Sequence, residues 1–398
     1  MLAKCLKFFQ IHNLIILLTF LVPSGFYNLS GGIIAVIFIV WMFEKKYLLI
    51  QSKLTPNVIP VVLFFLLFMF SLTYTKDINN GVNEIGQHVG LLIIPLIFVT
   101  LNLSSSFIKK IKKYFVISTI TFVLIADLYS VADILFTGIS SVHVNESFYF
   151  KYFSFGLTRV FNDWHPTYVS LSLVISFIYV LELKDDFFLA FRIAAFFVIV
   201  SNVYLLNSLI GILTYIIVLL FYVYQYSKYI LLLLIAFIFL IFITVPLGIS
   251  KLNKISEMEI YASDKEGDKN TLNLRLAKWK TSFNIFIKHP IFGVSPGDNR
   301  KALLNGYIHN KYFFCAEKKF SPHNQYLYIL TSFGVFGSLI FLWAFIVPLN
   351  IRFTRERALF TLSFSIFFLT EDILERQQGL FLWVLLYSLY LNDEKKII

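Results

Sequence analysis

The chain has 398 residues, of which 58% are hydrophobic and only 14% are charged. Because a soluble domain carries about 25% charged residues, this composition argues against a soluble protein and indicates an integral membrane protein with many spans. The net charge of +11 is spread over short loops between apolar segments, which excludes nucleic acid as an expected partner and favours cytoplasmic loops in contact with anionic membrane lipids.

Apolar segments recur along the whole chain. A transmembrane helix needs about 20 mostly apolar residues, with a range of about 17–25. Candidate spans lie at 8–24, 31–44, 57–73, 88–103, 114–136, 166–183, 189–207, 209–226, 229–249, 323–349, 358–372 and 378–391. The sequence therefore predicts an all-α, polytopic membrane protein of about 12 transmembrane helices, forming a single membrane domain over residues 1–398.

Basic residues gather in alternate loops. Lysine and arginine are retained on the cytoplasmic side of a membrane, so these loops and both termini are expected to be cytoplasmic. The intervening loops then lie outside, including a large loop at 250–322 before the third-last helix. The basic loop residues are Lys4, Lys7, Lys45, Lys46, Lys53, Lys109, Lys110, Lys112, Lys113, Lys184, Arg192, Lys228, Arg352, Arg355, Arg357, Lys395 and Lys396.

Polar residues that could take part in binding or catalysis concentrate in the expected outer loops. One such loop contains the stretch from Glu84 to His88, and another ends at His165 and Pro166. Proline is favourable in the first turn of a helix, so Pro166 predicts that a span begins there and that His165 lies at the membrane interface. A substrate-binding His165 and a solvated loop histidine are both open at this point.

The large outer loop contains an amphipathic helix. Its apolar residues recur at helical spacing, whereas Arg275 and Lys278 fall on the other face. Asn270 or Thr271 is placed to cap the helix and Pro290 to end it. Such a helix is typical of a membrane surface. The apolar residues are Leu276, Trp279, Phe283 and Phe286.

The basic face of this helix has two interpretations. Arginine offers a planar fork that matches phosphate oxygens, and lysine offers a point charge, so Arg275 and Lys278 could bind a phosphate group. Alternatively, the two side chains are solvated or extend their charged ends to the interface.

His323 and Asn324 mark the point where the outer loop enters an apolar span. Histidine changes charge near neutral pH and is suited to general base catalysis. Asn324 could cap the following helix or orient the imidazole. The alternative for His323 is a structural histidine that bonds to the backbone at the start of the span.

Several motifs now line up in order. Asn273-x-Arg275-x-x-x-Trp279 precedes His289-Pro290-Ile291-Phe292-Gly293-Val294-Ser295-Pro296-Gly297. His323-Asn324 follows, with Gly334 and Gly337 at H-N-x9-G-x-x-G spacing, and then Glu371-Asp372-Ile373-Leu374-Glu375-Arg376-Gln377-Gln378-Gly379. This arrangement resembles the O-antigen ligase and polymerase superfamily of envelope glycosyltransferases, which have many spans and a large outer loop late in the chain.

The resemblance implies a glycan donor on undecaprenyl diphosphate and an acceptor sugar hydroxyl on lipid A-core or on another lipid-linked chain. It places His323 at the catalytic position and Arg275 at a diphosphate contact, on the periplasmic face of the bacterial inner membrane. Many members carry Ser-Arg at the outer end of a middle span, where this chain has Ser208-Leu209. Arg159 is the expected substitute, and Asn324, His165 and Lys278 complete the expected substrate-binding residues.

The resemblance implies a glycosyltransferase, and with these residues we expect it to be metal-independent, inverting and without a cofactor. Its histidines lack the spacing of metal ligands, and no pair of carboxylates indicates a covalent intermediate. Ligase, polymerase and protein O-oligosaccharyltransferase share these features, so the sequence leaves the choice open. A transporter of lipid-linked glycan and an envelope protein without catalytic activity are rival classes, although a transporter predicts charged residues in mid-span.

Overall fold

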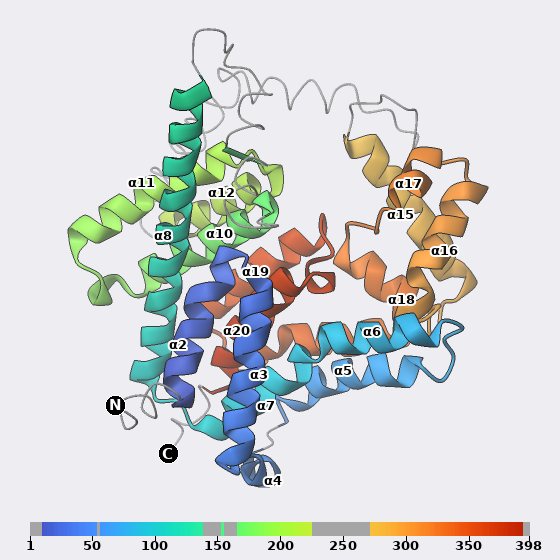
Figure 1. Ribbon diagram of the computed structural model, residues 1–398, viewed down its shortest axis with the longest axis horizontal. Coiled ribbons are helices and arrows are strands. Elements are labelled where there is room, and N and C mark those ends of the chain that lie inside the picture. The colour runs from blue at the N-terminus through green and yellow to red at the C-terminus, as the bar shows by residue number, and fades with distance from the viewer. Residues whose placement is uncertain (1–9, 54–55, 138–152, 155–164, 225–270, 393–398) are drawn as a thin grey trace.

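A computed structural model describes residues 10–53, 56–137, 153–154, 165–224 and 271–392 of the chain (Figure 1). Within these ranges every long element is a helix, which confirms the all-α prediction. The first group comprises α2 (Ile11–Leu21), α3 (Tyr27–Phe43), α4 (Ile50–Lys53), α5 (Ile59–Ser71), α6 (Ile78–His88), α7 (Gly90–Leu101) and α8 (Ser105–Thr137). The second comprises α10 (Pro166–Glu182), α11 (Leu189–Leu205), α12 (Leu209–Tyr224), α15 (Thr271–Lys288), α16 (Pro296–His309), α17 (Phe313–Lys318), α18 (Gln325–Ile351), α19 (Arg355–Phe368) and α20 (Gln377–Leu391).

The predicted spans coincide with these helices, apart from 229–249, which lies outside the described residues. Within the part of the chain that the structure describes, three helical segments are long and apolar enough to cross a membrane by themselves: Ile78–Leu101, Ser105–Phe136 and Gln325–Ile351. The other apolar helices have 10–17 residues, which is at or below the working minimum for a span. The count of twelve transmembrane helices is therefore not confirmed.

Two helices, α10 and α20, form the centre of the fold. Every residue of α20 from Gln378 to Leu391 is buried, and α10 is buried from Pro166 to Val180. A helix that is apolar on all sides is stable only when other helices surround it. Accordingly α20 packs against α7, and α10 packs against α8, α11, α12 and α19.

The surrounding helices expose large apolar side chains. Examples are Leu128 on α8 at 70% exposure, Phe197 on α11 at 66% and Leu339 on α18 at 63%. Soluble monomers rarely expose contiguous apolar surface of this kind. The exposed side chains and the buried centre together indicate a membrane protein.

Ion pairs gather where α8 and α19 begin and α10 and α12 end. Lys112 Nζ lies 2.6 Å from Glu356 Oε1, and Lys109 Nζ lies 3.6 Å from Asp186 Oδ2. Glu182 accepts hydrogen bonds from Arg355 and from the hydroxyl of Tyr222. The basic residues Lys109, Lys112 and Arg355 come from loops with an expected cytoplasmic location, and these ion pairs lie together at one end of α10 and α19. The cytoplasmic orientation itself stays a prediction.

Helix α18 is broken near its start. Gly334 has φ +63° and ψ −160°, a conformation that is essentially restricted to glycine. The segment 290–295 fills the break, because Val294 N–H and Val335 N–H donate to the carbonyls of Thr331 and Pro290 at 2.8 Å each. Two further bonds of 3.0 and 3.2 Å link Ser295 to Ser332 and Phe336 to Ile291.

These contacts join two of the sequence motifs physically. A Cβ atom on Gly334 would lie 2.3 Å from the carbonyl oxygen of Ile291, and one on Gly293 would lie 2.5 Å from the carbonyl oxygen of Thr331. Both distances are too short for non-bonded atoms. The glycines are therefore required for the close approach that fixes the segment after α15 against the first turns of α18.

We predict that Gly334→Ala destabilises the fold by at least about 1–3 kcal/mol, the usual cost of such a backbone conformation in a residue with a side chain. The overlap with Ile291 adds to this cost. Thermal unfolding of the detergent-purified protein measures the effect. Gly32→Ala on α3 is the control, since a Cβ there meets no atom within 4 Å. Equal melting temperatures for the two variants would contradict the packing described.

Candidate active site

Four helix ends meet at the opposite end of α10 and α19 from the ion pairs. They are the starts of α10, α18 and α20 and the end of α19. His165 precedes α10, His323 precedes α18, and the segment from Glu371 to Arg376 connects α19 to α20. This segment contains the short 3-10 helix η7 (Ile373–Glu375). Residues far apart in the sequence therefore come together here.

Two amides hold these ends together. Asn324 caps α18, because its Oδ1 accepts from Leu327 N–H at 3.0 Å, while its Nδ2 donates to the carbonyl of Leu369 at 3.0 Å. Gln325 is fully buried, and its Oε1 accepts from Leu374 N–H at 2.8 Å. The capping interpretation of Asn324 is confirmed. Both amides fix the position of His323 relative to the segment that connects α19 to α20.

His323 pairs with a carboxylate. Its Nδ1 lies 3.0 Å from Oε2 of Glu371, so Nδ1–H donates and the lone pair of a neutral imidazole is on Nε2. Glu371 is 6% exposed, whereas the His323 side chain is 21% exposed. The backbone φ of His323 is +47°, an uncommon conformation that is several-fold enriched in histidine.

Arg275 of α15 reaches the same carboxylate from the other side, with Nη2 3.8 Å from Oε1 of Glu371. Burial alone would raise the pKa of Glu371, but the hydrogen bond and charge of His323, with His165 and Arg275 nearby, hold its pKa below the ordinary value. Glu371 is therefore a carboxylate at neutral pH.

Lys278 lies one turn further along α15, with its ammonium 4.8 Å from the centroid of the Phe320 ring. The Phe320 ring also packs edge-on against His323, with 6.0 Å between centroids. Lys278 is 6% exposed. Burial, and secondarily the charge of Arg275, lower its pKa to about 8. The amine therefore loses its charge at mildly alkaline pH.

The structure contains the helix predicted in the large loop, α15. It begins at Thr271 and ends at Lys288, just before Pro290. Lys278 faces the protein interior, and Phe283 is 49% exposed on the outside. The predicted contact of the outer face with a membrane surface stays a prediction.

His165 completes the group on the α10 side. It precedes Pro166 at the first turn, as predicted, and its Nδ1 accepts from Thr167 N–H at 3.3 Å. Burial lowers the pKa of His165, with Glu371 opposing and Arg376 and His323 contributing to the decrease. His165 is therefore neutral at pH 7, and it lies within electrostatic range of Glu371, Arg376 and His323.

Arg376 is an exposed cation beside this group. It lines a cavity of about 320 Å³ together with Tyr27, Gln377 and Gln378. Arg159, the substitute expected for the missing arginine at Leu209, lies outside the described residues. Among the residues that the structure does describe, Arg376 is a second arginine near the group, within electrostatic range of His165.

The structure brings together His323, Asn324, Arg275, Lys278 and His165. Sequence reasoning did not assign a role to Glu371, Asp372 or Arg376. The only signal for them was their place in the C-terminal motif, because nothing in the spacing of residues 323 and 371 indicates a contact.

Two groups in the described chain have the geometry of metal ligands. Glu84, His88 and Glu375 form one, and His323, Glu371 and Asp372 form the other, with ligand atoms within 4.8 Å of one another in each. In the second group His323 and Glu371 already bond to each other.

Comparison with known families gives one match. Residues 194–342 match the sequence model of the family described as O-antigen ligase. The matched range contains Arg275, Lys278, His323 and Asn324, and it ends before the segment with Glu371. No curated protein matches the chain.

We predict that Glu371 makes stability depend on pH. Because its folded-state pKa is below the unfolded value of about 4.3, its stabilising contribution is complete above that value and is lost as pH falls through the folded pKa. Thermal unfolding in detergent between pH 7 and pH 3 should show this loss in the wild type. In Glu371→Gln the loss should be smaller.

The control is Glu317→Gln, which removes a carboxylate that is 66% exposed and paired only with Lys318. Such surface pairs contribute little to stability, so this variant should follow the wild type. A pH dependence in Glu371→Gln equal to that of the wild type would contradict the inferred role of Glu371.

Proposed function

Because residues 194–342 match the family described as O-antigen ligase, we propose that this protein transfers a glycan from undecaprenyl diphosphate to an acceptor sugar hydroxyl. The proposed location is the periplasmic face of the bacterial inner membrane, with lipid A-core as the acceptor. One observation carries the proposal: His323 is paired with Glu371 at 3.0 Å, and the two cations of α15 lie beside this pair.

His323 is the proposed general base. A hydroxyl is a weak nucleophile near neutral pH, and a base held in hydrogen-bond range assists its attack. With Nδ1–H bound to Glu371, Nε2 of His323 accepts the proton of the acceptor hydroxyl. Glu371 then acts as a positioning residue that fixes the tautomer and stabilises the imidazolium that forms, by the same logic as in other base–orienter pairs.

The cations act on the leaving group. The bond between the anomeric carbon and the phosphate oxygen breaks as the hydroxyl attacks, and negative charge grows on the diphosphate. Fixed cations lower the energy of such a transition state. Arg275 and Lys278 are proposed to bind the diphosphate, with Arg376 or Arg159 as the second arginine.

A single displacement with inversion is favoured over a covalent sugar–enzyme intermediate. The two oxygens of Glu371 face His323 and Arg275, so this carboxylate is not free to attack carbon. Each step is assigned to side chains of this chain, and none requires a metal.

We predict that His323→Ala reduces transfer by about 10²–10⁴-fold, the usual contribution of a general base. The measurement is surface polysaccharide in cells that contain equal amounts of inserted variant. His309→Ala, which removes another outer-loop histidine on α16, is the control and should be neutral. Unchanged polysaccharide in His323→Ala would exclude the catalytic assignment.

The same cells separate a ligase from a polymerase. Glycan that is made but not attached to lipid A-core supports a ligase. Single repeats attached to the core support a polymerase. A transporter predicts glycan that accumulates on the cytoplasmic side instead, and it does not require the imidazole of His323.

We predict that donor use declines above about pH 8. Lys278 carries its charge below its pKa of about 8 and becomes neutral above it, so attraction for the diphosphate weakens as pH rises. Lys278→Arg keeps the charge at high pH and should preserve activity above pH 8. Lys278→Met should reduce activity below pH 8, where the wild-type amine is charged, and the difference from wild type should shrink above pH 8. Steady-state kinetics with a lipid diphosphate donor measure these profiles. Superimposable wild-type and Lys278→Arg profiles would remove Lys278 from the donor site.

A further inference from the structure

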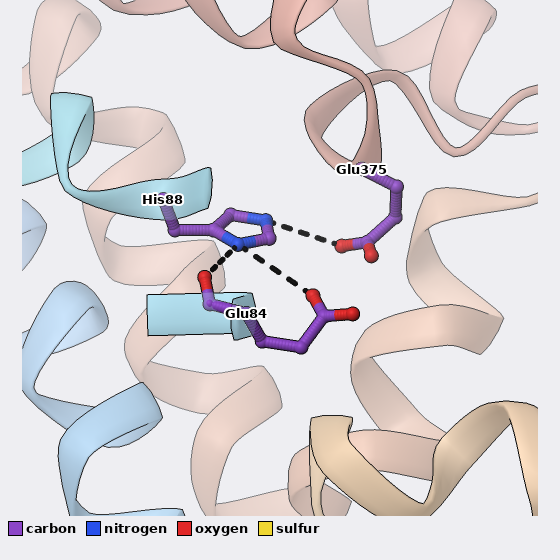
Figure 2. Close-up of side chains that lie close together, drawn as sticks. All are labelled: Glu84, His88 and Glu375. Atoms are coloured by element: carbon purple, nitrogen blue, oxygen red, sulfur yellow. Dashed lines mark hydrogen bonds and ion pairs between the residues drawn. The ribbon is translucent and has the colours of Figure 1, made fainter. Parts of the chain in front are cut away.

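A second group of ionisable side chains lies apart from His323. Glu84 and His88 stand one turn apart on α6, and Glu375 lies on η7, which precedes α20. His88 is 1% exposed and Glu84 is 7% exposed. Figure 2 shows the imidazole with Glu375 beyond Nε2 and with Glu84 beside Nδ1.

The hydrogen bonding of His88 fixes which nitrogen is free. Nδ1 lies 2.8 Å from the backbone carbonyl of Glu84, so Nδ1 carries the proton and Nε2 presents a lone pair in the neutral ring. The ring also stacks on Phe68, with 4.1 Å between centroids. A backbone carbonyl bound to one ring nitrogen is the usual arrangement when the other nitrogen ligates a metal.

The free atoms of the group lack hydrogen-bond partners. His88 Nε2, Glu84 Oε2 and Glu375 Oε1 are all buried and unpartnered. Nε2 lies 3.4 Å from Glu375 Oε1, but without the geometry of a hydrogen bond. A buried polar atom without a partner requires an explanation, and a bound water or ion is one that fits three such atoms side by side.

The spacing favours an ion. Ligand atoms bound at about 2.1 Å to a tetrahedral metal lie about 3.4 Å apart, which matches the Nε2–Oε1 distance. The Glu84 carboxylate completes a set of ligand atoms that lie within 4.8 Å of one another. Two carboxylates and a neutral imidazole balance the charge of a divalent cation.

We propose that Glu84, His88 and Glu375 bind one divalent transition-metal ion of the zinc class. An imidazole with carboxylates suits zinc and its neighbours, whereas calcium and magnesium prefer oxygen ligands only. The ion ties α6 to η7, and η7 lies in the same short segment as Glu371. It is a structural ion and takes no part in the proposed glycosyl transfer.

The alternative is an ion pair with a protonated His88. That arrangement leaves Nε2–H directed at Glu375 without hydrogen-bond geometry. Arg300 of α16 is within electrostatic range of Glu84, yet no ion pair forms between these two described residues. Among the described residues no lysine or arginine contacts the three ligand groups, whereas Glu371 contacts Arg275. Within the group, His88 lies 3.8 Å from Glu84 Oε2 and 3.4 Å from Glu375 Oε1.

The test measures metal content and stability of the detergent-purified protein. Elemental analysis of the wild type should give about one zinc-class ion per chain after dialysis. After chelation, added Zn²⁺ should raise the melting temperature again. His88→Ala and Glu375→Gln should each weaken Zn²⁺ binding by at least about 10–100-fold, the loss typical of even indirect metal partners.

Two controls locate the ion. His323→Ala should keep the metal, because it alters only the other ligand group, and Glu317→Gln controls for the loss of a carboxylate. Chelated wild type that no Zn²⁺, Mn²⁺ or Fe²⁺ stabilises would overturn the proposal, and this arm does not depend on whether a variant folds. Metal retained in His88→Ala and Glu375→Gln but lost in His323→Ala would also overturn it.

Discussion

The candidate site depends on one constraint, which is the backbone contact between the segment 290–295 and the break in α18 at Gly334. Four backbone hydrogen bonds and two glycines with positive φ hold these segments at a distance that excludes side chains. Buried backbone groups must be paired, so the break in α18 at Gly334 is stable only because the other segment fills it. Asn299 strengthens the contact, since its Nδ2 donates to the hydroxyls of Thr331 and Ser332 at 2.7 Å each.

This constraint explains how an outer-loop helix reaches a residue at the start of a span. The segment 290–295 directly follows α15, so fixing it against α18 also fixes Arg275 relative to His323. His323 and Asn324 immediately precede α18, so they lie at the end of its first turns that is opposite Gly334. This contact, together with the direct packing of α15 against α18, therefore sets the distance between the proposed cations and the proposed base, which loops alone would not hold to hydrogen-bond precision.

The helices of the fold and part of the site follow from the sequence. Hydrophobic segments predicted the helix positions, Pro166 predicted the start of α10, and helical spacing predicted α15. The Glu371 contact could not be predicted, because a residue pair separated by 48 positions is set by packing. The same applies to the group of Glu84, His88 and Glu375. The spacing of histidines along the sequence indicates only ligands within one segment. It does not indicate that α6 and η7 bring Glu375 next to Glu84 and His88.

Glu371 and Glu375 show how one short segment serves two groups. Glu371 faces His323 and Arg275, and Glu375 faces His88. The backbone between them is bound to Gln325, because Leu374 N–H donates to its side chain. Isolated buried carboxylates are costly unless a cation compensates them. Arg275 beside Glu371 and the proposed metal ion beside Glu375 would therefore stabilise one orientation of the segment. The position of Glu371 against His323 would then depend in part on whether that ion is bound.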